Sequence, residues 1–147
     1  MTRWNPWREL RARSAVRLWF ADLDGDLGRW ERTADGDEIL LDERLGRRER
    51  REVLAHELVH QERAVGWPVA TAATMETEED RVWRTALDRL APPEDVAAFL
   101  RRRGTAGPVL VHELADEFDL TDDAAREVMR LLAVRGILRR RRRARRP

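Results

Sequence analysis

The sequence predicts an α+β fold, in which a small three-stranded antiparallel sheet packs on one helix and a mainly helical C-terminal half follows. Residues 15–22 alternate apolar and polar side chains, as a half-buried strand does. Two further short segments, 29–33 and 38–41, lie between turn residues and are typical of strands. From about residue 47 onward, uninterrupted segments with apolar residues at helical spacing indicate helices.

Capping and turn residues predict where the first helix and the three strands lie. Asn5 can cap a short helix over residues 6–13, and Pro6 suits its first position. Turns at 24–26 and 35–36 would join the three strands in chain order, which gives an antiparallel meander. The third strand then leads directly into the next helix.

Helices account for most of the remaining chain. Thr77, with Asp80 three residues later, resembles a capping arrangement that opens one of them. The segment before it, 66–75, is rich in Ala and Thr and either closes over a cleft or only connects two helices. The helices are expected at 47–64, 77–90, 93–103, 110–118 and 122–134.

Length and charge distribution predict how the chain is divided. The 147 residues are expected to form one domain over 1–138, with a helical subdomain at about 107–138. Seven of the 29 basic residues fall in 139–147, so residues 1–138 hold 22 against 28 acids, a net charge of −6. The arginine-rich tail at 139–147 is therefore expected to be disordered.

Two absences in the sequence exclude whole classes of protein. There is no cysteine, which excludes a thiolate metal site and any dependence on an oxidising compartment. No apolar run approaches the roughly 20 residues of a membrane span. The N-terminus also lacks the apolar core of a signal peptide. We therefore expect a cytoplasmic protein without a membrane partner.

One motif in the predicted helix at 47–64 carries chemistry: His56-Glu57-Leu58-Val59-His60. A spacing of four residues places both imidazoles on one helix face, where a single metal ion can take a nitrogen from each. Glu57 lies about 100° around the helix axis and can reach a water held by the same ion. The motif predicts zinc binding by His56 and His60, with Glu57 as the catalytic base.

Catalytic zinc usually takes three protein ligands, so a third is expected outside this helix. In the next predicted helix Glu79 begins a stripe at spacings of three and four that is otherwise apolar: Val82, Ala86 and Leu90. An acid on the stripe that faces the core requires a partner. We therefore rank Glu79 first as the third ligand and Glu76, one turn earlier, second.

Together these residues resemble the ImmA/IrrE metallopeptidases, in which a strand ends just before a His-Glu-x-x-His helix. The resemblance covers about residues 15–95 and rests on 38–42, 51–60 and the spacing from Glu79 to Pro92. It implies a Zn²⁺-dependent endopeptidase with Glu79 as the third ligand. It also implies a protein substrate, a repressor or other regulator that a phage or mobile element often encodes.

His112 is the one histidine outside the motif. The segment His112-Glu113-Leu114-Ala115-Asp116 echoes the zinc motif with Asp in the last place, which we interpret as coincidence. The chain has no tyrosine to stabilise an oxyanion, so an auxiliary role of His112 in the cleft stays open.

The helices at 110–118 and 122–134 would also suit a helix-turn-helix. This gives an alternative function, a DNA-associated regulator with a structural or vestigial zinc site. Asp122 and Asp123 argue against it, because they place negative charge where the second helix would meet phosphate. The arginines of 139–147 would add only a weak, non-specific and salt-sensitive attraction to nucleic acid.

Overall fold

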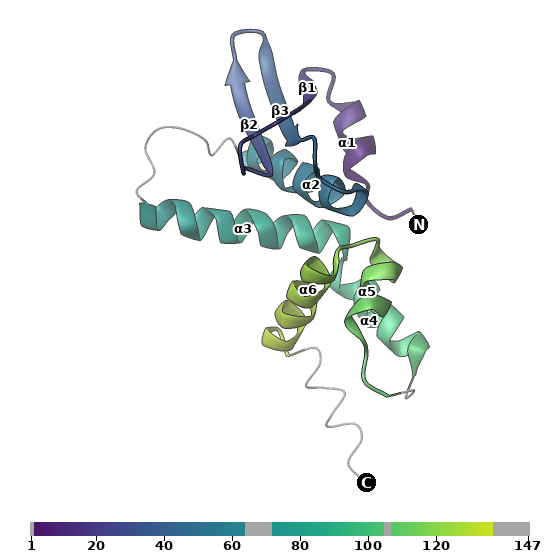
Figure 1. The fold of residues 1–147 in the computed structure, drawn as a ribbon. Coiled ribbons are helices and arrows are strands. Elements are labelled where there is room, and N and C mark those ends of the chain that lie inside the picture. Colours follow the sequence, from purple (N-terminus) through teal and green to yellow (C-terminus); the bar gives the residue numbers. More distant parts are fainter. Residues whose placement is uncertain (1, 64–71, 105–106, 137–147) are drawn as a thin grey trace. The chain divides into compact units, whose positions relative to one another are not determined.

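Residues 1–90 and 91–147 form two compact units. The first contains the sheet, and the second, in its described part, contains only helices (Figure 1). The α+β class is therefore confirmed. The computed structural model describes the backbone of residues 2–63, 72–104 and 107–136, and the side chains of all these residues except 72–76.

The first unit begins with a short helix whose start and N-cap the sequence predicts. Helix α1 spans Pro6–Ala12, and Asn5 Oδ1 accepts hydrogen bonds from the backbone N–H groups of Trp7 and Arg8, at 2.9 and 3.4 Å. The expected cap is confirmed. The other elements of this unit are β1 (Val16–Ala21), β2 (Gly28–Thr33), β3 (Gly36–Asp42), α2 (Arg47–Arg63) and α3 (Ala72–Leu90).

The sheet differs from the expected meander. Its strand order is β1-β3-β2, so the last strand in sequence lies in the middle. Strands β2 and β3 form the expected antiparallel hairpin, with Thr33 opposite Gly36. Strand β1, however, pairs in parallel with β3, with Val16 opposite Asp37. The sheet is mixed, and the prediction of three antiparallel strands was wrong.

The connection between β1 and β2 explains this order. Residues 22–27 pass over the carboxyl end of β3, because Asp42 anchors them there. The Asp42 carboxylate accepts a hydrogen bond from the Leu23 N–H at 3.0 Å, and the Asp42 N–H donates to the Leu27 carbonyl at 2.9 Å. The predicted turn is present, with positive φ at Asp24 and Gly25, but the strands that it joins are not neighbours.

Helix α2 packs along one face of the sheet and lies between the sheet and α3 (Figure 1). Residues 51–59 are consequently buried on every side of the helix, polar residues included. The core cluster joins β3 to α2 and consists of Ile39, Leu41, Leu45, Val53, Leu54 and Leu58, each at most 8 % exposed.

Helix α3 begins earlier than the sequence predicts. It starts at Ala72, so Thr77 lies inside the helix and the prediction that it caps the helix was wrong. Nothing between Ala72 and Thr77 breaks a helix, and the good helix formers Ala, Met and Glu extend it. Its apolar stripe is confirmed, with Val82, Ala86 and Leu90 all fully buried. The rest of the expected loop, 66–71, lies outside the described residues.

The second unit consists of α4 (Pro93–Arg103), α5 (Val111–Phe118) and α6 (Asp122–Val134), at the predicted positions. Thr121 Oγ1 caps α6 by accepting a hydrogen bond from the Ala124 N–H at 3.2 Å. Within the described residues, no helix is both long and apolar enough to cross a bilayer. The arginine tail at 139–147 lies outside them.

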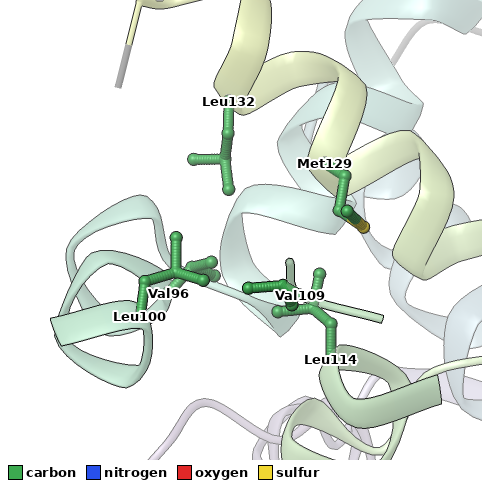
Figure 2. Close-up of a pocket in the computed structure, with 6 residues that line it drawn as sticks. All are labelled: Val96, Leu100, Val109, Leu114, Met129 and Leu132. Atoms are coloured by element: carbon green, nitrogen blue, oxygen red, sulfur yellow. The ribbon is translucent and has the colours of Figure 1, made fainter. Parts of the chain in front are cut away.

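A small cavity lies in the core of this second unit. Its volume is about 20 Å³, room for about one water-sized sphere. Figure 2 shows side chains from α4, α5, α6 and the segment before α5 that point toward it. Its walls are apolar, so we interpret it as a packing gap and not as a binding site. The lining residues are Val96, Leu100, Val109, Leu114, Met129 and Leu132.

Candidate metal centre

The histidine motif lies in the buried part of α2. His56 and Glu57 are 6 % and 5 % exposed, and the side chain of His60 is 13 % exposed. The helix runs from 47 to 63 without Gly or Pro, so residues four apart share one face. The two imidazoles therefore lie together, with their Nε2 atoms 3.0 Å apart and their planes at 78°.

Helix α3 adds a carboxylate to the two imidazoles. Glu79 Oε2 lies 3.1 Å from His56 Nε2, and Glu79 Oε1 lies 2.8 Å from His60 Nε2. One ligand atom from each of the three residues lies within 4.8 Å of the others. The Glu79 side chain is 49 % exposed, so solvent reaches the group at this residue. The structure thus brings together the three residues that the sequence singles out as metal ligands.

The chemistry of these side chains fits a zinc ion. Two neutral imidazoles and one carboxylate are a ligand set that zinc enzymes use. Burial lowers the pKa of His56 to about 3, and His60 contributes to the shift, so the ring stays neutral and keeps a lone pair to donate. Two ring nitrogens 3.0 Å apart are close enough for both to share one proton or to contact one cation beside them. A bound cation would satisfy both nitrogens and the carboxylate at once.

Glu57 occupies a different environment from the three ligand candidates. Burial raises the pKa of Glu57 to about 8, the nearby Glu79 adds to the shift, and a hydrogen bond from the backbone N–H of Trp30 opposes it. At this pKa the carboxyl group is mostly protonated near neutral pH, and a cation bound beside it would favour the ionised form that a general base needs.

Strand β2 lies close to Glu57 at Gly28. A Cβ atom at this position would lie 2.4 Å from Val53 Cγ1, 3.1 Å from Glu57 Oε1 and 3.3 Å from Glu57 Cγ. The requirement for glycine here is one of space, since even a methyl group would displace its neighbours. The backbone of β2 therefore packs directly on the candidate base.

A comparison with protein-family models and a search of curated proteins found no match. The resemblance to the ImmA/IrrE metallopeptidases consequently rests on the motif and its surroundings in this chain.

The other two sequence candidates are Glu76 and His112. Glu76 lies in α3, but its side chain is outside the described part of the structure. His112 is exposed on α5 of the second unit, and the group found among the described residues does not include it. Sequence reasoning missed Gly28 and Trp30, whose contacts depend on sheet order. It also missed Trp83, which the spacing of four from Glu79 places on the same face of α3.

Ion pairs link α3 to α2 on both sides of the ligand group. Arg63 pairs with Glu78 near the start of the contact. Arg89 donates to both carboxylate oxygens of Glu62, at 2.9 and 2.5 Å, near its other end. Arg13, the residue that follows α1, also pairs with Glu62, so this acid links the end of α1 to α2 and α3. These ion pairs hold α3 against α2 and so help to position Glu79 opposite His56 and His60.

Proposed function

We propose that this protein is a zinc-dependent endopeptidase of the ImmA/IrrE type. Its substrate would be a repressor or other regulatory protein of a phage or mobile element. One observation carries the proposal: Glu79 from a second helix meets both Nε2 atoms of His56 and His60, at 2.8 to 3.1 Å. The spacing of four residues in α2 is enough to bring the two histidines together. The Glu79 carboxylate comes from α3, so its position beside them is an independent observation.

Each residue of the site has a role in this proposal. His56, His60 and Glu79 would hold the zinc ion. When bound, zinc supplies the positive charge that polarises the scissile carbonyl and acidifies the attacking water. Glu57 accepts the proton of that water and passes it to the leaving amine. The Trp30 N–H holds the Glu57 carboxylate by a hydrogen bond and so orients it.

Strand β2 supports an extended peptide as the substrate. It is an edge strand, because β3 flanks it on one side and no other strand of the described chain flanks it on the other. Its backbone also contacts the candidate base through Trp30. A peptide that adds to a free edge gains main-chain hydrogen bonds with little demand on its sequence. The regulatory nature of the substrate comes from the family resemblance alone.

The test is the Glu57→Gln variant. The amide keeps the size of the side chain but cannot accept a proton, so cleavage should fall by ~10²-fold to 10⁴-fold while zinc stays bound. We would measure cleavage of repressors encoded near the gene, together with zinc content. Glu49→Gln is the matched control, because Glu49 lies exposed near the start of the same helix. Equal cleavage rates for Glu57→Gln and the wild type would exclude Glu57 as the base.

The alternative of a DNA-associated regulator has less support. Asp122 and Asp123 are exposed at the N-terminus of α6, the end that would approach phosphate. The exposed cations Arg126 and Arg130 pair with Asp123 and Glu127 of the same helix. Their charges are therefore already compensated. Absence of cleavage by the wild type across all neighbouring repressors would favour this alternative.

A further inference from the structure

Trp83 of α3 lies against the first histidine of the motif. Its ring centroid is 4.3 Å from that of His56, and the two planes are tilted by 38°. Trp83 follows Glu79 by one helical turn, so α3 contributes both a carboxylate and an aromatic ring to the same face. The His60 ring contacts His56 at 4.6 Å. Trp83, His56 and His60 thus form a continuous series of three rings.

A metal-binding histidine needs its ring held in one orientation. Rotation about its last side-chain torsion is soft, and a half-turn replaces Nε2 with a carbon atom. In most metal sites a hydrogen bond to the second ring nitrogen fixes the orientation. Here Nδ1 of His56 is buried and has no hydrogen-bond partner among the described residues. The contact with the Trp83 ring therefore restricts the His56 ring from outside the group of proposed ligands.

We propose that Trp83 is a positioning residue, which aims His56 Nε2 at the metal by ring stacking in place of the usual hydrogen bond. The inference rests on the proposed metal site but not on proteolysis. Aromatic pairs in such tilted arrangements stabilise each other beyond the effect of burial alone. A flat ring also limits rotation of its neighbour more strictly than an aliphatic side chain of similar bulk.

The test compares Trp83→Phe with Trp83→Leu. Both keep an apolar side chain in the half-buried position, but only Phe keeps a ring face for His56. We expect Trp83→Phe to bind zinc nearly as the wild type does. Trp83→Leu should bind about 10-fold to 100-fold more weakly, the usual effect of losing a residue that orients a ligand. Trp19→Leu is the control, because Trp19 lies on β1 and is 50 % exposed.

A second readout separates positioning from general stability. Cobalt(II) titrated into each apoprotein gives visible absorption bands that report the geometry of the metal's ligands. Trp83→Leu should change the position or intensity of these bands, while Trp83→Phe and Trp19→Leu should leave them unchanged. Thermal unfolding of each apoprotein checks that all the variants are folded.

The outcomes distinguish this inference from the proposed function. If the wild type binds one zinc and Trp83→Leu matches it in zinc affinity and cobalt spectrum, Trp83 does not position His56 and the metal site stands. Equal weakening in Trp83→Leu and Trp83→Phe also overturns the stacking role. If the wild type binds no zinc, the proposed site itself is wrong, whatever the Trp83 variants do.

Discussion

Gly28 of β2 packs closely against Glu57 of α2, and a methyl group added to Gly28 would be crowded by this side chain and by Val53. A Cβ atom on Gly28 would come within 3.1 Å of the Glu57 carboxylate and within 2.4 Å of Val53. Two residues farther along, the same strand donates its Trp30 N–H to Glu57. The position of the candidate base is therefore set by the backbone of an edge strand.

Gly28→Ala should reduce proteolysis without removing zinc. The added methyl group must displace Val53, Glu57 or the strand, and a displacement of about 1 Å at a catalytic group can cost ~10²-fold in rate. The measurement is cleavage rate beside zinc content. Gly46→Ala is the control, since a Cβ there meets only the flexible end of Glu49 at 3.3 Å. Full activity in Gly28→Ala would show that the base does not depend on this contact.

Removal of any proposed ligand should lower zinc binding. His56→Ala and His60→Ala each delete one of three protein ligands, so stoichiometric zinc should be lost after dialysis. Glu79→Gln should weaken binding far more than Glu76→Gln, because an amide is a poor substitute for a ligating carboxylate. Elemental analysis at neutral pH gives both results. A larger effect from Glu76→Gln would mean that the third ligand is Glu76, one turn earlier in α3, and not Glu79.

Asp37 should make stability depend on pH in the acid range. Its carboxylate accepts hydrogen bonds from Arg32 at 2.9 and 3.3 Å and from Gln61 at 2.8 Å. The hydrogen bonds from Arg32 hold the pKa of Asp37 below its ordinary value, burial opposes this, and Gln61 adds to the lowering. Because the folded state has the lower pKa, the stabilisation is present above about pH 4 and is lost as the pH falls further.

The Asp37→Asn variant tests this dependence. It should lose about 1 kcal/mol near neutral pH and show a flatter decline in acid than the wild type. Urea unfolding between pH 7 and the acid range gives the free energy of unfolding at each pH. Asp35→Asn, at an exposed turn position, is the control. Parallel curves for Asp37→Asn and the wild type would refute the assignment to Asp37.

The cavity in the second unit should accept one more methyl group. Val96→Ile adds a methylene toward an apolar space of about 20 Å³, and burial of a methylene contributes about 0.8 kcal/mol. We expect a higher free energy of unfolding in chemical denaturation. Val134→Ile, which is 74 % exposed in the wild type, should be neutral. Destabilisation by Val96→Ile would mean that the space does not have the shape of a methyl group.

The sequence predicted the elements of the sheet but not their arrangement. Alternation of apolar residues over 15–22 and the turn residues around 29–33 and 38–41 predict three strands, yet neither signal carries information on which strand pairs with which. The arrangement depends on Asp42, whose hydrogen bond to the Leu23 N–H draws the connection across the end of β3. A carboxylate that binds a backbone group 19 residues away leaves no local pattern to detect.

The site was predictable where helical spacing governs it. His56, His60 and Glu79 meet because residues four apart share a face of α2 and because Glu79 lies on the inward stripe of α3. The contacts of Glu57 with Gly28 and Trp30 were not predictable. These contacts require β2 to lie at the edge of the sheet and against α2. That position depends on the strand order, which the sequence does not reveal.

The central position of β3 also affects the order in which the chain assembles. Strands β2 and β3 are joined by a two-residue turn and can pair as soon as both exist, whereas Val16 must wait for a partner 21 residues later, at Asp37. During synthesis, β1 therefore leaves the ribosome before its partner strand β3 does, and its apolar residues Leu18 and Phe20 have no sheet to pack in. It can dock only after β3 is complete, so until then this strand is open to mispairing in the nascent protein.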